Sequence, residues 1–296
     1  MIDLSKLTTE QRNGNTMDLD VLEPLEFAKK MNDEDKKVAL AIEKEIEVIA
    51  QAIQWGIVTL ENEGRIIYMG AGTSGRLGVL DAVECPPTFG VDYNRVIGLM
   101  AGGDSAFVKA KEGSEDSTNE GEDDLRNLNV SSKDLIVGLA ASGRTPYVIS
   151  GLNYANSINC KTIAIACNKN SEIGSVAKLA IEIDCGPELL SGSTRLKAGS
   201  AQKMVLNMIS TGAMVGIGKT YENLMVDVKL SNKKLEQRGK NIIKEITNAS
   251  DKQIEIALKE ANNSVKIAIV MILYNCNAEM AKAYLQKSKG HIRKIK

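Results

Sequence analysis

Short apolar runs alternate with amphipathic stretches through the middle of this chain of 296 residues. Five runs are rich in Ile, Val, Leu and Ala, and they lie at 65–70, 95–101, 134–140, 161–167 and 179–184. Runs that are apolar on both faces and are separated by helical segments are typical of parallel strands joined by helical crossovers. The pattern therefore predicts an α/β fold with a doubly wound, five-stranded parallel sheet.

Helical patterns precede and follow the predicted strands. From residue 33 to 61, apolar residues such as Val38, Ile42 and Ile49 recur at steps of three and four, which predicts one long amphipathic helix. An apolar helix is predicted at 198–216, and only helical patterns follow residue 222. We therefore expect three parts: a polar N-terminal arm at 1–32 that folds over the body or over a partner subunit, a sheet domain at 33–224, and a small all-helical C-terminal region at 225–296.

The charge balance narrows the class of partner. The chain has 37 basic and 38 acidic residues and a formal net charge of -1, so it offers no basic field for a nucleic acid or an anionic membrane. Its longest apolar runs are shorter than the ~20 residues of a membrane span. The N-terminus also lacks the basic start and apolar stretch of a secretory signal. We therefore expect a cytoplasmic protein that binds neither nucleic acid nor membrane.

Cysteine and histidine usage excludes several kinds of chemistry. The five cysteines are odd in number and form no CxxC pair, so neither a disulfide framework nor a zinc ribbon is indicated. The single histidine, His291, lies in a lysine-rich tail, and zinc binding by histidines or Ser-His-Asp catalysis is therefore not expected. An enzyme of this composition would move protons with carboxylates, lysines or hydroxyls.

Two predicted strands run into similar turns, Ala-Gly-Thr-Ser-Gly-Arg at 71–76 and Ala-Ser-Gly-Arg-Thr at 141–145. A turn that leads from a parallel strand into a helix offers free backbone N–H groups and the positive end of the helix dipole to an anion. Each turn alone is equally compatible with a tight connection, but two of them on neighbouring strands would converge on one ligand. The candidate phosphate-binding residues are Gly72, Thr73, Ser74, Gly75, Arg76, Ser142, Gly143, Arg144 and Thr145.

A third turn rich in Gly and Ser precedes the predicted helix at 198–216. The hydroxyls of Ser193 and Thr194, and the charges of Arg195 and Lys197, would add further donors beside an anion. Arg195 is equally explained as a surface residue or as an ion-pair partner in the core.

Two further matches to known motifs are discounted. Residues 70–75 match GxGxxG after a strand, but no acidic residue ends the next strand, as a dinucleotide-binding fold requires. Residues 218–220 look like the end of a P-loop, yet Ala213 stands where the first glycine is needed and a helix precedes the segment.

Two glutamates are candidates for proton transfer. Glu84 is expected to end the helix that begins at Ser74, just before Cys85-Pro86-Pro87, where burial would raise its pKa and suit it to acid/base work. Glu115 lies in a predicted break between two helical segments. By position alone, both residues are equally explained as solvated side chains at helix ends.

Four runs of the sequence resemble the N-acetylmuramic acid 6-phosphate etherases, and the similarity extends from about Leu7 to Asn207. They are GAGTSGRLGVLDAVECPPTFG, AGGDSAFVKAKEGSEDS, ASGRTPYV and GPELLSGSTRLKAGSAQK. The resemblance implies that the sheet domain is a sugar isomerase (SIS) domain that binds a sugar phosphate. It also implies a cytoplasmic enzyme of cell-wall recycling that splits the D-lactyl ether of its substrate without a metal or redox cofactor.

The resemblance also implies roles for residues. The two catalytic glutamates of the family fall on Glu84 and Glu115, where Glu84 would protonate the departing lactate and later activate water, and Glu115 would remove the C2 proton. Arg195 or Lys197 would steady the enolate or the lactyl carboxylate by charge. Ser200 stands where the family more often has threonine, so the hydroxyl is kept.

The spacing of Ser74 and Glu84 predicts a shared active site. Ten helical residues at 1.5 Å each separate them by ~15 Å, which is further than a sugar 6-phosphate readily spans. Either the helix bends, or Glu84 serves a phosphate site on a neighbouring subunit. We predict the second arrangement, a homodimer with active sites at the interface.

Three other functions remain open at this level. A sugar-phosphate sensor without catalysis is suggested by the glucokinase regulatory protein, which resembles these etherases, but the presence of both glutamates favours an enzyme. An aldose–ketose isomerase of the same fold often uses a histidine to open the sugar ring, and His291 lies in the tail. A dinucleotide enzyme is the third, and it rests on the discounted GxGxxG match alone.

Overall fold

The computed structural model describes residues 7–109, 111–230 and 232–296. These residues form two compact units. The first consists of the described residues up to Val83 together with Asn94–Ser210, and the second of Glu84–Tyr93 and Thr211–Lys296. The helical C-terminal region therefore lies within the second unit, which also takes in Glu84–Tyr93 from the middle of the chain.

The first unit is built on the predicted parallel sheet. Its strands are β1 (Ile66–Gly70), β2 (Val96–Met100), β3 (Leu135–Leu139), β4 (Lys161–Ala166) and β5 (Leu179–Glu182). They lie in the order β2-β1-β3-β4-β5, and all neighbours are parallel. The chain builds to one side of β1 and then to the other, so the topological switch point lies between β1 and β3. The predicted fold class is confirmed.

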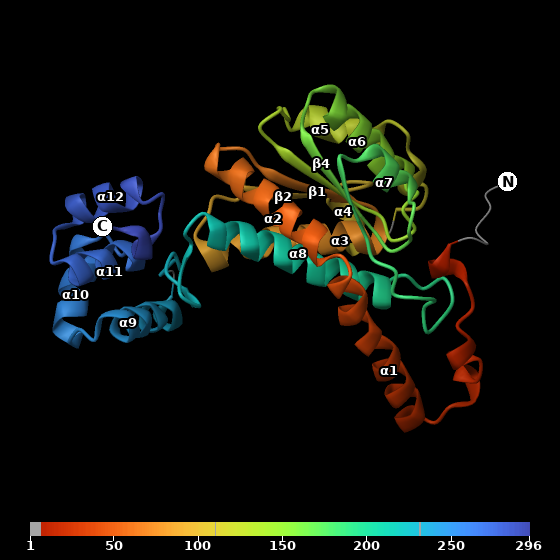
Figure 1. Ribbon diagram of the computed structural model, residues 1–296, viewed down its shortest axis with the longest axis horizontal. Coiled ribbons are helices and arrows are strands. Elements are labelled where there is room, and N and C mark those ends of the chain that lie inside the picture. The colour runs from red at the N-terminus through yellow and green to blue at the C-terminus, as the bar shows by residue number, and fades with distance from the viewer. Residues whose placement is uncertain (1–6, 110, 231) are drawn as a thin grey trace. The chain divides into compact units, whose positions relative to one another are not determined.

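Helices cover both faces of this sheet (Figure 1). On one face lie α5 (Glu120–Asn127), α6 (Pro146–Ser157) and α7 (Glu172–Val176), and on the other lie α2 (Ile46–Glu61) and the first-unit parts of α3 (Gly72–Phe89) and α8 (Lys197–Gly216). Neighbouring residues of β1 face opposite layers. Tyr68 donates to Asp81 of α3 at 3.1 Å, whereas the end of the Met69 side chain packs on Gly151 of α6, where an added Cβ would lie 2.1 Å from Met69 Cε.

The predicted helix over 33–61 is wrong as a single element. The structure has α1 (Pro24–Glu43) and α2, and they are separated by Lys44 and Glu45. Glu45 leaves the helical conformation, is buried, and pairs with Lys169 near the end of β4. The apolar period continues through the break, so it gave no sign of this tertiary contact. α1 also begins inside the predicted arm, with its proline in the first turn, where a missing N–H costs nothing.

The arm before α1 lies over the body of its own chain. It forms three short 3-10 turns, η1 (Thr8–Glu10), η2 (Gly14–Thr16) and η3 (Leu19–Val21). Asn13 donates to Pro187 O at 3.2 Å, and Thr16 donates to Leu189 O at 2.8 Å. Of the two arrangements that the sequence allowed, the described arm takes the contact within the chain.

The helix α3 is longer than predicted. It was expected to run from Ser74 to Glu84, but it starts at Gly72 and continues through Pro86 and Pro87 to Phe89. Prolines disfavour helix interiors because they lack an N–H. Here the last turn holds because Cys85, Pro86 and Phe89 are buried, and because the N–H of Gly90 bonds to Pro86 O at 3.0 Å. Tertiary packing thus overrides the local signal.

The second unit is a helical cluster with its own core. Its elements after α8 are β6 (Thr220–Tyr221), β7 (Leu224–Met225), α9 (Lys233–Thr247), α10 (Asp251–Glu260), α11 (Val265–Tyr274), α12 (Ala278–Lys287) and the 3-10 turn η5 (Ile292–Lys294). α11 is the central helix and contacts α9, α10 and α12. The small antiparallel pair β6–β7 was not predicted, because strands of two residues carry no periodicity.

The lysine-rich tail is anchored within this unit. A ring nitrogen of His291 lies 3.0 Å from Gly216 O, and Ile292 is buried. Lys266 is buried beside it and donates to Gly218 O at 2.7 Å and to Asp227 at 2.9 Å. Among the described residues, no helix has both the length and the apolar character of a membrane span.

Candidate active site

The turn after β1 places the amino end of α3 tightly against the strand. A Cβ on Gly75 would lie 2.5 Å from Gly70 O, and Gly72 has a φ of 52°, so only glycine suits either position. The first N–H groups of an α-helix have no acceptor within the helix. Those of Gly72, Thr73 and Ser74 therefore form the predicted opening for an anion.

Arg76 on α3 has a structural contact within this turn. Its Nε and Nη2 donate to Phe107 O and Ala106 O, each at 2.8 Å, and so hold the short helix α4 (Ser105–Val108) beside α3. The guanidinium therefore positions a wall of the site and adds positive charge there.

The turn after β3 is equally constrained. Gly143 has a φ of 77°, and a Cβ there would lie 2.4 Å from Ser171 Cβ. Arg144 donates to Glu172 at 2.9 Å. Thr145 stands at the N-cap of α6, and within the described structure its side chain makes no capping bond to that helix. Its hydroxyl is thus not committed to the first turn of α6.

Glu115 borders both turns. β1 and β3 are paired in the sheet, which brings the two turns to the same carboxyl edge. The exposed Glu115 lies in the 3-10 turn η4 (Ser114–Asp116). It lines a cavity of about 290 Å³ together with Gly72 and Arg76, and a second cavity of about 420 Å³ together with Ser142, Arg144 and Thr145. The structure thus brings together one predicted glutamate and both predicted anion turns.

Local contacts hold Glu115 at this place. Gly113, which precedes η4, has a φ of 80° and turns the chain. Ser114 is buried under the exposed Glu115. Further on, Glu120 accepts a bond from Gly102 N–H at 2.8 Å, which ties the segment after η4 to the end of β2.

Glu84 does not belong to the same compact unit as the two turns. It is part of the second compact unit, whereas Glu115 is part of the first. The side chain of Glu84 is exposed, so the expectation that it is buried is wrong for the single chain. The helix α3 carries it on an outward-facing turn, and the apolar residues just before it, Leu80 and Val83, are 39% and 51% exposed.

In the third predicted turn, a carboxylate of the protein already occupies the N-terminus of α8. The buried Glu188 accepts the N–H groups of Lys197 and Ala198, each at 2.9 Å, and so caps the first turn of α8 with a carboxylate. Burial raises the pKa of Glu188, against the lowering effect of these two N–H bonds. Lys197 is 1% exposed and pairs with Glu34 of α1. Its charge is therefore engaged in the interior.

The other residues of that turn stay near the first turn of α3. Arg195 is exposed, and Ser193 and Thr194 are half-buried. Thr194 O accepts the N–H of Gly199 at 2.9 Å, and a Cβ on Gly199 would lie 3.5 Å from Thr73 Cγ2. The beginnings of α8 and α3 thus pack against each other.

Two polar residues of this region were missed by sequence reasoning. Gln202 on α8 is buried and accepts a hydrogen bond from the hydroxyl of Ser74 at 2.9 Å. Asn168, after β4, donates to Ala141 O at 3.2 Å and to Ser142 O at 3.4 Å, and so supports the turn after β3. A helical glutamine and a loop asparagine carry no signal of such contacts in sequence.

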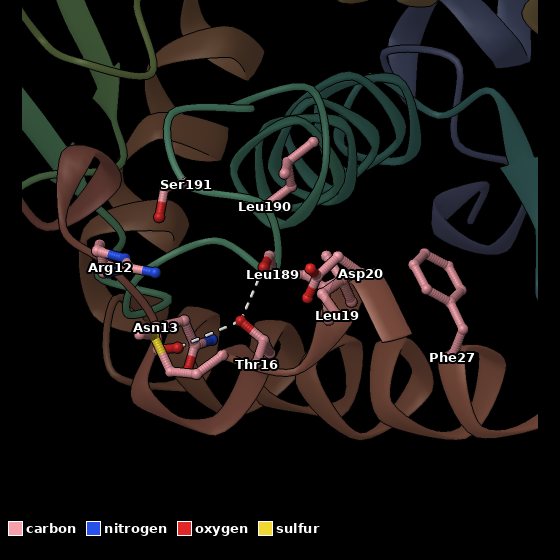
Figure 2. Close-up of a pocket in the computed structure, with 10 residues that line it drawn as sticks. Arg12, Asn13, Thr16, Leu19, Asp20, Phe27, Leu189, Leu190 and Ser191 are labelled. Carbon is pink, nitrogen blue, oxygen red and sulfur yellow. Dashed lines mark hydrogen bonds between the residues drawn. The ribbon is translucent and has the colours of Figure 1, made fainter. Parts of the chain in front are cut away.

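A larger cavity lies between the N-terminal arm and the segment before α8 (Figure 2). It measures about 540 Å³, and among its lining residues are Arg12 and Phe27 on one side and Leu189 and Ser191 on the other. No residue predicted to bind or react lines it. The two cavities that share Glu115 are therefore the candidate active site.

Comparison with known proteins gives the family. The chain is 55% identical over 293 residues to the N-acetylmuramic acid 6-phosphate etherase of Oceanobacillus iheyensis, which covers 99% of this chain and 100% of that protein. It is 54% identical over 291 residues to the etherase of a Bacillus cereus strain, with 98% and 99% covered. The chain belongs to the N-acetylmuramic acid 6-phosphate etherase family.

Two family models match parts of the chain, and both describe SIS domains. The model of the glucokinase regulatory protein N-terminal SIS domain matches residues 48–156, and the general SIS domain model matches residues 115–212. Among solved structures, a phosphoheptose isomerase from Francisella tularensis is similar at a TM-score of 0.48 and 15% identity, covering 66% of this chain and 100% of that one. The runs that carry the etherase resemblance fall on α3, η4, the turn after β3 and the start of α8.

Proposed function

We propose that this chain cleaves the D-lactyl ether of N-acetylmuramic acid 6-phosphate to N-acetylglucosamine 6-phosphate and D-lactate, in the recycling of cell-wall amino sugars. The observation that carries this proposal is identity above one half, over nearly the full length, with proteins named for that activity. The placement of Glu115 beside the two predicted anion-binding turns also supports it.

The 6-phosphate is assigned to the turns after β1 and β3. The first-turn N–H groups of α3 supply donors and the positive end of a helix dipole. Hydroxyls of Thr73, Ser74, Ser142 and Thr145 can donate to further phosphate oxygens. Glu188 already accepts the first N–H groups of α8, so these N–H groups do not bind the phosphate. The third turn contributes only the side chains of Ser193, Thr194 and Arg195 to phosphate binding.

The reaction follows from the substrate's chemistry. In the ring-opened sugar the C2 proton is acidified by the aldehyde, and the lactyl oxygen on C3 is β to it. We assign Glu115 as the base that removes the C2 proton and Glu84 as the acid that protonates the lactyl oxygen as the C3–O bond breaks. Water then adds to C3 with Glu84 as base, and a proton returns to C2. Elimination and hydration together involve no net oxidation or reduction, so no redox cofactor is needed, and we propose that the two glutamates carry the proton transfers without a metal.

Glu84 reaches this chemistry in a homodimer whose active sites lie at the interface. Ser74 and Glu84 belong to one helix, α3, which supports this arrangement because ten helical residues extend ~15 Å. The exposed Leu80 and Val83 beside Glu84 are apolar groups that a second copy would cover. Burial there would also give Glu84 the environment that a general acid needs.

A cytoplasmic location accompanies this function. All five cysteines of the chain lie in the described residues and are free thiols. Four of them are buried and Cys276 is partly buried, and free thiols of this kind are typical of a reducing compartment.

The test is incubation with N-acetylmuramic acid 6-phosphate in heavy-oxygen water. Release of D-lactate, with the label at C3 of the sugar, is the expected result. Glu84→Gln and Glu115→Gln should each lower kcat at least a hundredfold. The matched controls Glu47→Gln on α2 and Glu279→Gln on α12, both exposed, should keep the wild-type rate.

A sugar-phosphate sensor is the second candidate, since the glucokinase regulatory protein domain also matches residues 48–156. Tight binding of the sugar phosphate without lactate release would favour the sensor. Full activity of both glutamine variants would instead show that the catalytic assignment is wrong.

A further inference from the structure

Gln202 holds an unpaired amide nitrogen in the interior of the first unit. The side chain is 0% exposed, and its Nε2 has no hydrogen-bond partner among the residues that the structure describes. Its Oε1 accepts the hydroxyl proton of Ser74 at 2.9 Å. A buried N–H without a partner is unfavourable, so a state that pairs it would be preferred.

This amide lies under the proposed phosphate turn. Ser74 belongs to the first turn of α3, where the helix N–H groups lack acceptors. Gln202 approaches from α8, whose Gly199 packs against Thr73 of the same turn. A hydroxyl that faces a phosphate must donate to it, because the phosphate oxygens are acceptors. In the structure the Ser74 hydroxyl already donates its hydrogen bond to Gln202.

A glutamine amide can exchange its two ends by a half rotation of its last bond, because the oxygen and the nitrogen have nearly the same size. After that rotation Nε2 donates to the oxygen of Ser74. The hydroxyl proton of Ser74 is then released for another acceptor, and one N–H of Gln202 gains a partner. Oε1 takes the buried position that Nε2 held, where an unpaired carbonyl oxygen is tolerated better than an unpaired N–H. No proton is transferred between groups in this exchange.

We propose that Gln202 is a positioning residue that acts through Ser74: when the phosphate of a sugar 6-phosphate binds at the first turn of α3, the amide turns over, and Ser74 donates to a phosphate oxygen. The inference rests on the proposed function, which assigns the phosphate to this turn. Phosphate binding thereby frees the Ser74 hydroxyl for the ligand and exchanges an unpaired N–H of Gln202 for an unpaired carbonyl oxygen.

Two substitutions separate this role from packing. Gln202→Met keeps the length of the side chain but removes both the donor and the acceptor. Gln202→Glu keeps an acceptor for the Ser74 proton but, when ionised, cannot donate to Ser74. Gln51→Glu, at an exposed position of α2, is the matched control for the added charge.

The experiment measures binding and turnover separately in the full-length protein. Calorimetry with N-acetylglucosamine 6-phosphate gives the Kd, and lactate release from N-acetylmuramic acid 6-phosphate gives KM and kcat. We expect Gln202→Met to raise Kd and KM about tenfold with kcat within about twofold, and Gln202→Glu to raise them further. Gln51→Glu should leave Kd, KM and kcat at wild-type values.

A double-mutant cycle with Ser74→Ala tests the coupling. If Gln202 acts through Ser74, Gln202→Met should raise Kd much less in the Ser74→Ala background than in wild type. Equal effects in both backgrounds, or a lower melting temperature with Kd and KM unchanged, would overturn the inference. Absence of phosphate-ester binding by the wild type would overturn it too, whereas binding without lactate release would overturn the proposed function alone.

Discussion

The ammonium group of Lys197 lies 2.6 Å from Glu34 Oε2, and the two side chains belong to residues that are 1% and 4% exposed. Lys197 begins α8 and Glu34 lies in α1, so this ion pair ties the N-terminal helix to the start of the helix that follows the third turn. Lys37 also contacts the Glu34 carboxylate from one turn further along α1. The charge of Lys197, which the sequence pattern assigned to anion binding, is thereby engaged in holding the fold.

Replacing Lys197 by methionine should destabilise the protein. The substitution leaves Glu34 buried with only the half-exposed Lys37 as its ion-pair partner, and breaking a buried pair costs about 3–5 kcal/mol. We expect a loss of about 3 kcal/mol in urea unfolding, because Lys37 offsets part of the cost. Lys36→Met is the control, since its exposed pair with Asp33 contributes under about 1 kcal/mol. Equal losses in both variants would contradict the importance of the buried pair.

The contribution of Glu34 to the free energy of unfolding should decrease at acid pH. Burial alone would raise the pKa of Glu34, but hydrogen bonds from Lys197 and Lys37 outweigh it and lower the pKa from 4.5 to about 2. A carboxyl group whose pKa is lower in the folded than in the unfolded state stabilises the folded protein. This stabilisation is complete above the unfolded-state pKa and is lost as the pH falls through the folded-state pKa. The difference in unfolding free energy between wild type and Glu34→Gln should therefore be constant from pH 7 to 5 and shrink from about pH 4.5 towards 2. A difference that does not change with pH would contradict this.

Gly143→Ala should distort the turn after β3. Its φ of 77° disfavours any side chain, and a Cβ would lie 2.4 Å from Ser171 Cβ. We expect a stability loss of about 1–3 kcal/mol and a higher KM, because Ser142 and Thr145 flank this glycine. Gly14→Ala in the arm is the matched control, since a Cβ there meets nothing within 4 Å. Melting temperature and initial rates would measure both effects, and a neutral Gly143→Ala would show that the turn has room to adjust.

Mixed dimers should regain activity if the active sites are shared. Chains that carry Glu84→Ala and chains that carry Ser74→Ala are co-expressed with different tags, and the doubly tagged dimer is isolated. One of its two sites would be intact, so we expect about half of the wild-type activity per dimer. No recovery in the mixed dimers, or a monomer in light scattering, would count against shared sites.

Sequence patterns located the sheet and much of the candidate site. Strands buried on both faces must be apolar throughout, so their runs are visible without any tertiary information. The pairing of β1 with β3 then brought together the two turns that matched in sequence. The breaks and ends of helices were less visible. The helix breaks at Glu45 although the apolar period continues through it, and α3 continues through Pro86 although proline disfavours a helix interior. In both places packing against residues far away in the chain decides the backbone conformation.

The sequence by itself determined the strands, the two small-residue turns and the family, since these depend on local composition and on long runs of similar residues. Only the tertiary structure decided which polar groups form hydrogen bonds or ion pairs with one another. Glu188 caps α8, Lys197 pairs with Glu34 over a separation of 163 residues, and Gln202 accepts a hydrogen bond from Ser74. A polar side chain that leaves water must find a partner nearby in space, and which residue that is depends on the packing of helices and not on the order of residues along the chain.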